Sequence, residues 1–135
     1  MVLVKWDDSY SLDIRQIDDQ HKIIFHLING LHQTIEQANP RAIQRQALIA
    51  LENYTVEHFR HEEELMEEFK YPDLPAHREQ HANFISKLHE FKESYEQEEF
   101  TLSKDMVRFL VDWLILHIHG TDKKYSRCFL DNGIT

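Results

Sequence analysis

Two pairs of metal-ligating side chains lie close together in the middle of the sequence. His58 and Glu62 are four residues apart, and so are His77 and His81. Residues four apart lie on the same face of an α-helix. A Tyr-Pro-Asp break at residues 71–73 separates the pairs. The spacing therefore predicts two consecutive helices that each present two ligands on one face.

Two further histidines continue apolar stripes on other segments. His21 lies four residues after Ile17 and three before Ile24, and His117 lies four residues after Trp113. These positions face the core of an amphipathic helix. Taken alone, each histidine is better explained as a packed or hydrogen-bonded core residue than as a ligand. Together they predict five inward histidines contributed by four helices.

Asp122 follows His117 by five residues, which is an awkward spacing for a shared site. On a regular α-helix the two side chains would point about 140° apart. Gly120 lies between them, and a glycine near a helix end permits a break or bulge that could turn Asp122 inward. Spacing alone leaves the orientation of Asp122 open.

The chemistry of this set favours metal binding. A buried carboxylate such as Glu62 is costly unless it is paired or bound to a metal, and buried imidazoles need partners for both nitrogens. Ligands without thiolate argue against a cysteine-rich structural zinc site. Seven ligands are too many for one tetrahedral ion but suit two ions such as iron, zinc or manganese. The Glu-x-x-His and His-Glu-x-x-His motifs are absent.

Composition restricts the class of protein. The 135 residues suit a single domain, and only three glycines and three prolines favour long helices. A net charge of −9 disfavours binding to nucleic acid or to an anionic membrane, and suggests a monomer. We find no apolar run of membrane-spanning length and no secretory signal. Cys128 is the only cysteine, so we expect no intrachain disulfide and a cytoplasmic location.

The apolar stripes predict an all-α, up-down-up-down four-helix bundle in a single domain, residues 1–135. An irregular N-terminal arm, residues 1–16, would pack on the bundle as a lid. The bundle would span 17–120, with helices beginning near Asp18, Pro40, Pro75 and Ser103, and Asp18 or Asp19 as the first cap. A short C-terminal helix would follow at 121–131. We expect the run 62–68 to be mostly a solvated face, apart from Glu62.

The ordered motifs resemble the hemerythrin family, in particular its single-domain bacterial members. The matching segments are Ile17-Asp18-Asp19-Gln20-His21, His58-Phe59-x-x-Glu62-Glu63-x-Leu65-Met66, Tyr71-Pro72, His77-x-x-x-His81-x-x-Phe84 and Trp113-Leu114-x-x-His117-Ile118-x-Gly120-Thr121-Asp122. They extend over residues 17–122, which is almost the whole predicted bundle.

The resemblance implies reversible O2 binding at a non-haem di-iron centre, with Fe2+ in the deoxy form and Fe3+ in the oxy and met forms. Glu62 and Asp122 would bridge the irons together with a hydroxide or oxide, so Asp122 would point inward. One coordination position would stay free for O2, on the iron with fewer histidines. By the same resemblance, His77, His81 and His117 would hold one iron and His21 and His58 the other, and Ile24, Phe59, Trp113 and Leu114 would form an apolar O2 pocket.

The implied role is oxygen storage, delivery or sensing without enzymatic activity, and the sequence indicates no recipient protein. A di-iron enzyme or detoxifying protein acting on peroxide or nitric oxide is the alternative. Such an enzyme needs a proton donor beside the open site, and the pocket positions offer none, which favours carriage. The five other histidines are expected at surface or boundary positions: His26, His32, His61, His89 and His119. His61 and His119 lie closest to the site in sequence.

Overall fold

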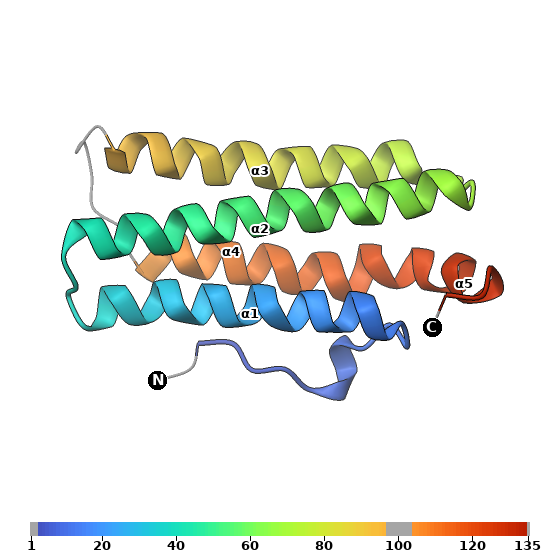
Figure 1. Cartoon of the computed structure of the whole chain (residues 1–135), viewed down its shortest axis with the longest axis horizontal. Coiled ribbons are helices and arrows are strands. Elements are labelled where there is room, and N and C mark those ends of the chain that lie inside the picture. The colour runs from blue at the N-terminus through green and yellow to red at the C-terminus, as the bar shows by residue number, and fades with distance from the viewer. Residues whose placement is uncertain (1–2, 97–103, 135) are drawn as a thin grey trace.

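The computed structural model describes residues 3–96 and 104–134 and shows a four-helix bundle (Figure 1). No strand occurs among the described residues, so the predicted all-α class is confirmed. In chain order the elements are a 3₁₀ turn η1 (Asp8–Tyr10), α1 (Arg15–Glu36), α2 (Arg41–Glu68), α3 (Leu74–Glu96), α4 (Lys104–Leu116), a π-helical turn η2 (His117–Asp122) and α5 (Lys123–Asp131).

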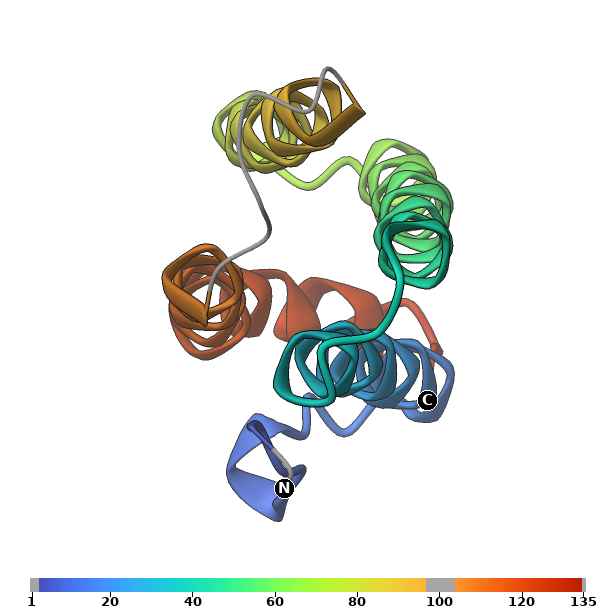
Figure 2. The ribbon, with the colours of Figure 1, turned by 90° about the vertical axis from the view of Figure 1, so that its left-hand side faces the viewer.

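Consecutive long helices are antiparallel neighbours. α1 packs against α2 and α4, and α2 packs against α3, so the four helices surround one interior (Figure 2). The short α5 lies across the end of the bundle (Figure 1). Ala38 and Lys70, each two residues after the last residue of α1 or α2, adopt left-handed backbone angles. No described helix has both the length and the apolar character needed to cross a membrane.

The start of α1 differs from the prediction. The helix begins at Arg15, and Ile14 precedes it without a side-chain cap. Asp18 is therefore not the cap but an acidic residue of the first turn. It accepts hydrogen bonds from Ser11 Oγ (2.6 Å) and Leu12 N (2.9 Å), and so it fastens the preceding chain to the helix. The predicted start at Ser103 lies outside the described residues, which resume at Lys104 in α4.

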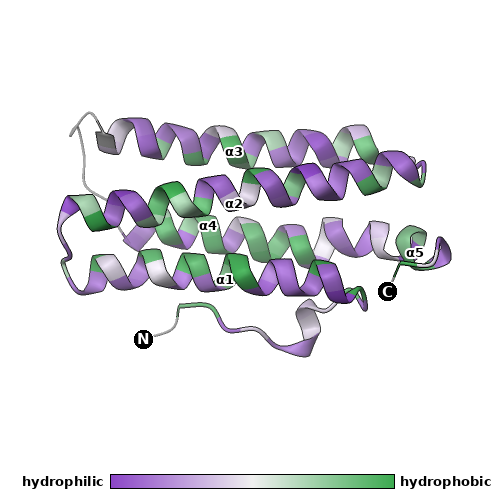
Figure 3. Ribbon diagram, viewed as in Figure 1, coloured by the Kyte–Doolittle hydropathy of each residue, from purple (hydrophilic) through white to green (hydrophobic). Residues whose placement is uncertain are grey.

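The apolar core consists of two clusters with a polar layer between them. Along α1, Ile17 belongs to one cluster and Ile24 to the other, and His21 lies between them. Along α2, Leu51 and Met66 belong to different clusters. The hydropathy colouring shows hydrophobic and hydrophilic residues interleaved along each helix (Figure 3). The inward histidines therefore occupy a layer that apolar side chains close from both ends.

The N-terminal arm is attached to α1 and to the π-helical turn. The Asn29 side chain accepts hydrogen bonds from the backbone N–H groups of Leu3 and Val4 and donates one to the Val4 carbonyl. Further along the arm, the Tyr10 ring packs edge-on against Phe25 and stacks on His119, with ring centroids 4.7 Å apart in the stack. The arm thus connects α1 to the segment His117–Asp122.

His32 does not lie at the surface, so its predicted position is wrong. The residue is only 4% exposed, and its Nε2 atom is 3.2 Å from Glu36 Oε1. Its position one turn after Ile28 places it on the buried face of α1, a stripe position that its polarity concealed. The other four behave as predicted: His26, His89 and His119 are exposed and His61 is partly exposed.

Replacing Asn29 by alanine should release the arm locally. The substitution removes three hydrogen bonds at a partly buried site, which costs about 1 to 3 kcal/mol. Amide hydrogen exchange at Leu3 and Val4 should accelerate by roughly tenfold or more, because exchange reports local opening. Gln33→Ala, an exposed change one turn further along α1, is the control. Equal exchange rates in the two variants would contradict the role of Asn29.

Candidate metal centre

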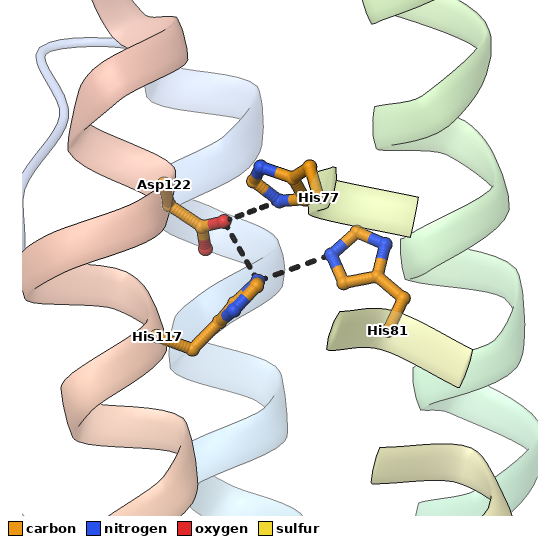
Figure 4. A group of neighbouring side chains, drawn as sticks. All are labelled: His77, His81, His117 and Asp122. Atoms are coloured by element: carbon orange, nitrogen blue, oxygen red, sulfur yellow. Dashed lines mark hydrogen bonds and ion pairs between the residues drawn. The ribbon is translucent and has the colours of Figure 1, made fainter. Parts of the chain in front are cut away.

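Seven buried side chains converge in the polar layer and form two groups of potential metal ligands. Within each group, one ligand atom from each residue lies within 4.8 Å of the others. None of the seven residues is more than 3% exposed. The three-histidine group consists of His77, His81, His117 and Asp122 (Figure 4), and the two-histidine group consists of His21, His58 and Glu62.

A π-helical turn brings His117 and Asp122 onto one face. In a π-helix the hydrogen bonds join residues five apart, so one turn ends close to five residues after it begins. The His117 Nε2 and Asp122 Oδ1 atoms are accordingly 2.9 Å apart. The predicted bulge therefore exists and turns Asp122 inward. It does not depend on a glycine, because a Cβ atom at Gly120 would meet nothing within 4 Å.

The Asp122 carboxylate lies between the two groups. Its Oδ1 atom is 2.9 Å from His77 Nε2, and its Oδ2 atom is 3.3 Å from His21 Nε2. One oxygen thus faces each group, which is the arrangement that a bridging carboxylate requires.

Glu62 also contacts histidines of both groups. Its Oε1 atom is 3.0 Å from His58 Nε2 and 3.5 Å from His81 Nε2. Its Oε2 atom accepts a short hydrogen bond from the Tyr125 hydroxyl. The two carboxylates therefore join the groups into one site.

Many polar atoms of this layer have no hydrogen-bond partner among the described residues, although they are buried. They include both ring nitrogens of His21 and His77, His58 Nε2, Glu62 Oε1 and both carboxylate oxygens of Asp122. Buried polar atoms left in this state are costly. Cations held between the inner nitrogens and the carboxylate oxygens would satisfy the inner atoms, so the residues present fit a two-metal site.

The electrostatics of the site keep both carboxylates ionised. Burial and the neighbouring Asp122 charge would raise the pKa of Glu62, but His58 and His81 outweigh them and lower that pKa to about 2. Burial would likewise raise the pKa of Asp122, but the surrounding histidines, His117 foremost, hold it well below its ordinary value. Ionised carboxylates are the form that binds cations.

The outer nitrogens of two ligand histidines have glutamine partners that the sequence did not reveal. His58 Nδ1 lies 2.6 Å from Gln20 Oε1, and Gln20 Nε2 in turn lies 3.2 Å from His61 Nδ1. His117 Nδ1 lies 2.9 Å from Gln80 Oε1. Each glutamine directly precedes one ligand histidine in sequence but contacts a different ligand histidine on another helix. Local spacing therefore could not predict these pairs.

Glu63 also contacts the site, from a run that is expected to be mostly solvated. It is 22% exposed, and its Oε2 atom is 2.9 Å from His81 Nδ1. Partial burial would raise the pKa of Glu63, but the hydrogen bonds from His81 and Arg78 outweigh burial and lower it. Burial acts the other way on His81 and lowers its pKa in spite of the glutamate partner.

Two of the four residues expected to form an apolar pocket, Phe59 and Trp113, stack on ligand histidines. Phe59 stacks on His81 with ring centroids 3.9 Å apart and planes 4° apart, and Trp113 stacks on His117 at 4.5 Å and 15°. Both rings thus cover the three-histidine group. Trp113 is half-buried, whereas Ile24, Phe59 and Leu114 are at most 3% exposed.

Comparison with known proteins supplies a family. A model described as the hemerythrin HHE cation binding domain matches residues 12–128. The chain is 35% identical to a bacteriohemerythrin of Methylococcus capsulatus, covering 95% of this chain and 98% of that protein. It is 31% identical to a hemerythrin-like protein of Naegleria gruberi, covering 90% and 89%. A crystal structure of wild-type hemerythrin matches with a TM-score of 0.89 and 34% identity, covering 93% and 97%.

The stability of the metal-free protein should fall in acid because of Glu62. Its pKa is about 2 in the fold, against an ordinary value of 4.5. A carboxyl whose pKa is lower in the folded chain stabilises the fold above the unfolded value, and this stabilisation is lost as the pH falls through the folded value. The free energy of unfolding, measured by denaturant between pH 4.5 and 2, should decrease less steeply in Glu62→Gln. Identical pH profiles would show that Glu62 does not contribute.

Proposed function

The chain belongs to the hemerythrin family, and we propose that it binds molecular oxygen reversibly at a pair of iron ions. The predicted resemblance is confirmed by the family match over residues 12–128. One observation carries the functional proposal: the two buried ligand groups are unequal in histidine number and share two carboxylates. Two irons, when bound, supply the two electrons that O2 takes up on binding and returns on release.

The ligand residues would bind two ions. The three-histidine group would hold one ion and His21 with His58 the other, and Glu62 and Asp122 would contact both. A buried site with oxygen and nitrogen donors suits iron among the transition metals. Because the two-histidine group has one donor fewer, we expect the small-molecule ligand on that side.

The surroundings exclude water from the centre. Apolar clusters close the layer from both ends, and Ile24, Phe59 and Leu114 within them are buried. A dry pocket limits the supply of protons from solvent. Such an environment favours release of O2 over its irreversible reduction.

Tyr125 holds one carboxylate without serving as an acid. Its hydroxyl donates to Glu62 Oε2, and burial together with the charges of Glu62 and Asp122 raises the pKa of Tyr125 well above its ordinary value. The hydroxyl therefore keeps its proton and fixes the orientation of Glu62. The apolar residues Ile24, Phe59 and Leu114 carry no ionisable group. This absence of a usable acid supports a carrier over an enzyme that acts on peroxide or nitric oxide.

We further propose that the protein works as a monomer in the cytoplasm, in oxygen storage, delivery or sensing. A net charge of −9 keeps copies of the chain apart, and a single cysteine is compatible with a reducing compartment.

Iron content and the visible spectrum test the proposed function directly. The purified protein should hold about two irons per chain, as expected for two ligand groups. The reduced protein should be colourless, gain colour on exposure to air and lose it again when O2 is removed. One zinc per chain without colour would exclude the proposal. Sustained turnover of peroxide or nitric oxide would favour the enzyme instead.

Replacing Leu114 by alanine should shorten the lifetime of the oxygenated protein. The change opens space at a buried apolar position on α4, three residues before His117, and this space would admit water and protons. We expect loss of the oxygenated colour to accelerate about tenfold, within the range usual for residues that surround a metal site. Leu116→Ala is the matched control, because Leu116 is the same residue type on α4 but 73% exposed. Equal lifetimes for both variants would refute the role of Leu114.

A further inference from the structure

His81 is held on three sides. Its Nε2 atom faces the centre, 3.1 Å from His117 Nε2, and its outer nitrogen is directed away from the other labelled side chains (Figure 4). That outer nitrogen, Nδ1, lies 2.9 Å from Glu63 Oε2. The second oxygen of Glu63 accepts a hydrogen bond from Arg78 Nε (3.0 Å). Phe59 covers the ring face, so the plane of the imidazole is fixed independently of Glu63.

This arrangement differs from that of the other ligand histidines. The outer nitrogens of His58 and His117 face the neutral amides of Gln20 and Gln80. Among the five described ligand histidines, only His81 has its outer nitrogen hydrogen-bonded to a carboxylate. The structure therefore contains its own comparison between a charged and an uncharged partner at the same ring position.

The partner type matters for the position of the imidazole proton. An ionised carboxylate only accepts hydrogen bonds, whereas an amide can rotate to offer either an acceptor or a donor. A carboxylate on Nδ1 therefore places the proton there and leaves the lone pair on Nε2. Carboxylate partners also raise the basicity of a histidine that binds a metal.

We propose that Glu63 is a positioning residue for His81: it fixes the proton on Nδ1, directs the Nε2 lone pair to the metal and strengthens this one ligand. The proposal rests on the proposed function, since it assumes that His81 binds a metal. In this proposal the histidines of the three-histidine group differ in donor strength: His81 is a stronger electron donor to the metal than His77 or His117.

The location of Glu63 suits this role. The side chain borders a surface groove of about 620 Å3 between α2 and α3, whose lining includes Phe59 and His81. It is 22% exposed, unlike Glu62, which is completely buried. Partial solvation and the Arg78 partner let Glu63 keep its charge without binding a metal itself. The partly exposed Glu63 carboxylate can thus accept a hydrogen bond from the buried ligand His81.

The first test needs no metal. In the metal-free protein, nitrogen NMR should show the proton of His81 on Nδ1, with a strongly deshielded N–H resonance. In Glu63→Gln that resonance should move to higher field, because the neutral amide is a weaker acceptor. Glu64→Gln is the control: it removes the same charge from the adjacent residue, which is 62% exposed and pairs with Arg60 instead. A His81 protonated at Nε2 in the wild-type protein would overturn the proposal even if the variant failed to fold.

The second test measures the affinity of the metal-free protein for Co2+ by competition with a chelator. Glu63→Gln should weaken Co2+ binding about 10- to 100-fold, and Glu64→Gln should leave it unchanged. Equal affinities and equal His81 resonances in the two variants would overturn the role of Glu63. If Glu63→Gln binds Co2+ more weakly but the iron-loaded wild-type protein shows no reversible colour change, the role of Glu63 is supported and oxygen binding is refuted. Failure of this proposal is therefore distinguishable from failure of the proposed function.

Discussion

Glu62 and Asp122 carry two negative charges in a layer of the bundle where their side chains are 0% and 1% exposed. Removing a charge from water costs several kcal/mol unless other groups compensate. Here compensation comes from imidazoles directed at the carboxylates from all sides, and this requirement fixes how the helices must be set against one another. A shift of one helix by a single residue would turn its ligand away from the carboxylates and leave a charge without a partner.

The same requirement explains the irregular end of the last long helix. A regular helix would direct Asp122 away from His117, so α4 gives way to a π-helical turn just where the two ligands occur. Such a turn is less favourable than a regular α-helix and persists only where contacts with the surrounding structure stabilise it. Two contacts do so: Tyr10 of the arm stacks on His119, and Thr121 donates to Gln80. The arm and α3 therefore contribute to the geometry of the site from outside it.

The fold and the inner ligands follow from periodicity, and the outer partners do not. An apolar stripe with a histidine in it defines an inward position within one helix, so His21, His58 and His81 could be placed from sequence alone. The partners Gln20 and Gln80 act across helices, and which histidine they reach depends on the packing distance between helices. Polarity alone does not predict burial or contact with the site. His32 is polar but buried, and Glu63 contacts a ligand although most of its neighbouring glutamates are exposed.

The two sides of the centre differ in more than the number of histidines. Phe59 and Trp113 stack on rings of the three-histidine group, and Glu63 contacts one of them. The two-histidine group has Gln20 as the partner of His58. An outer nitrogen without a hydrogen-bond partner occurs in both groups, on His21 and on His77. The three-histidine side therefore has more ring contacts, together with the carboxylate partner that is proposed above to strengthen one ligand. Under the proposed function, a metal on this side would keep its ligands, and a small molecule would exchange on the side with fewer donors.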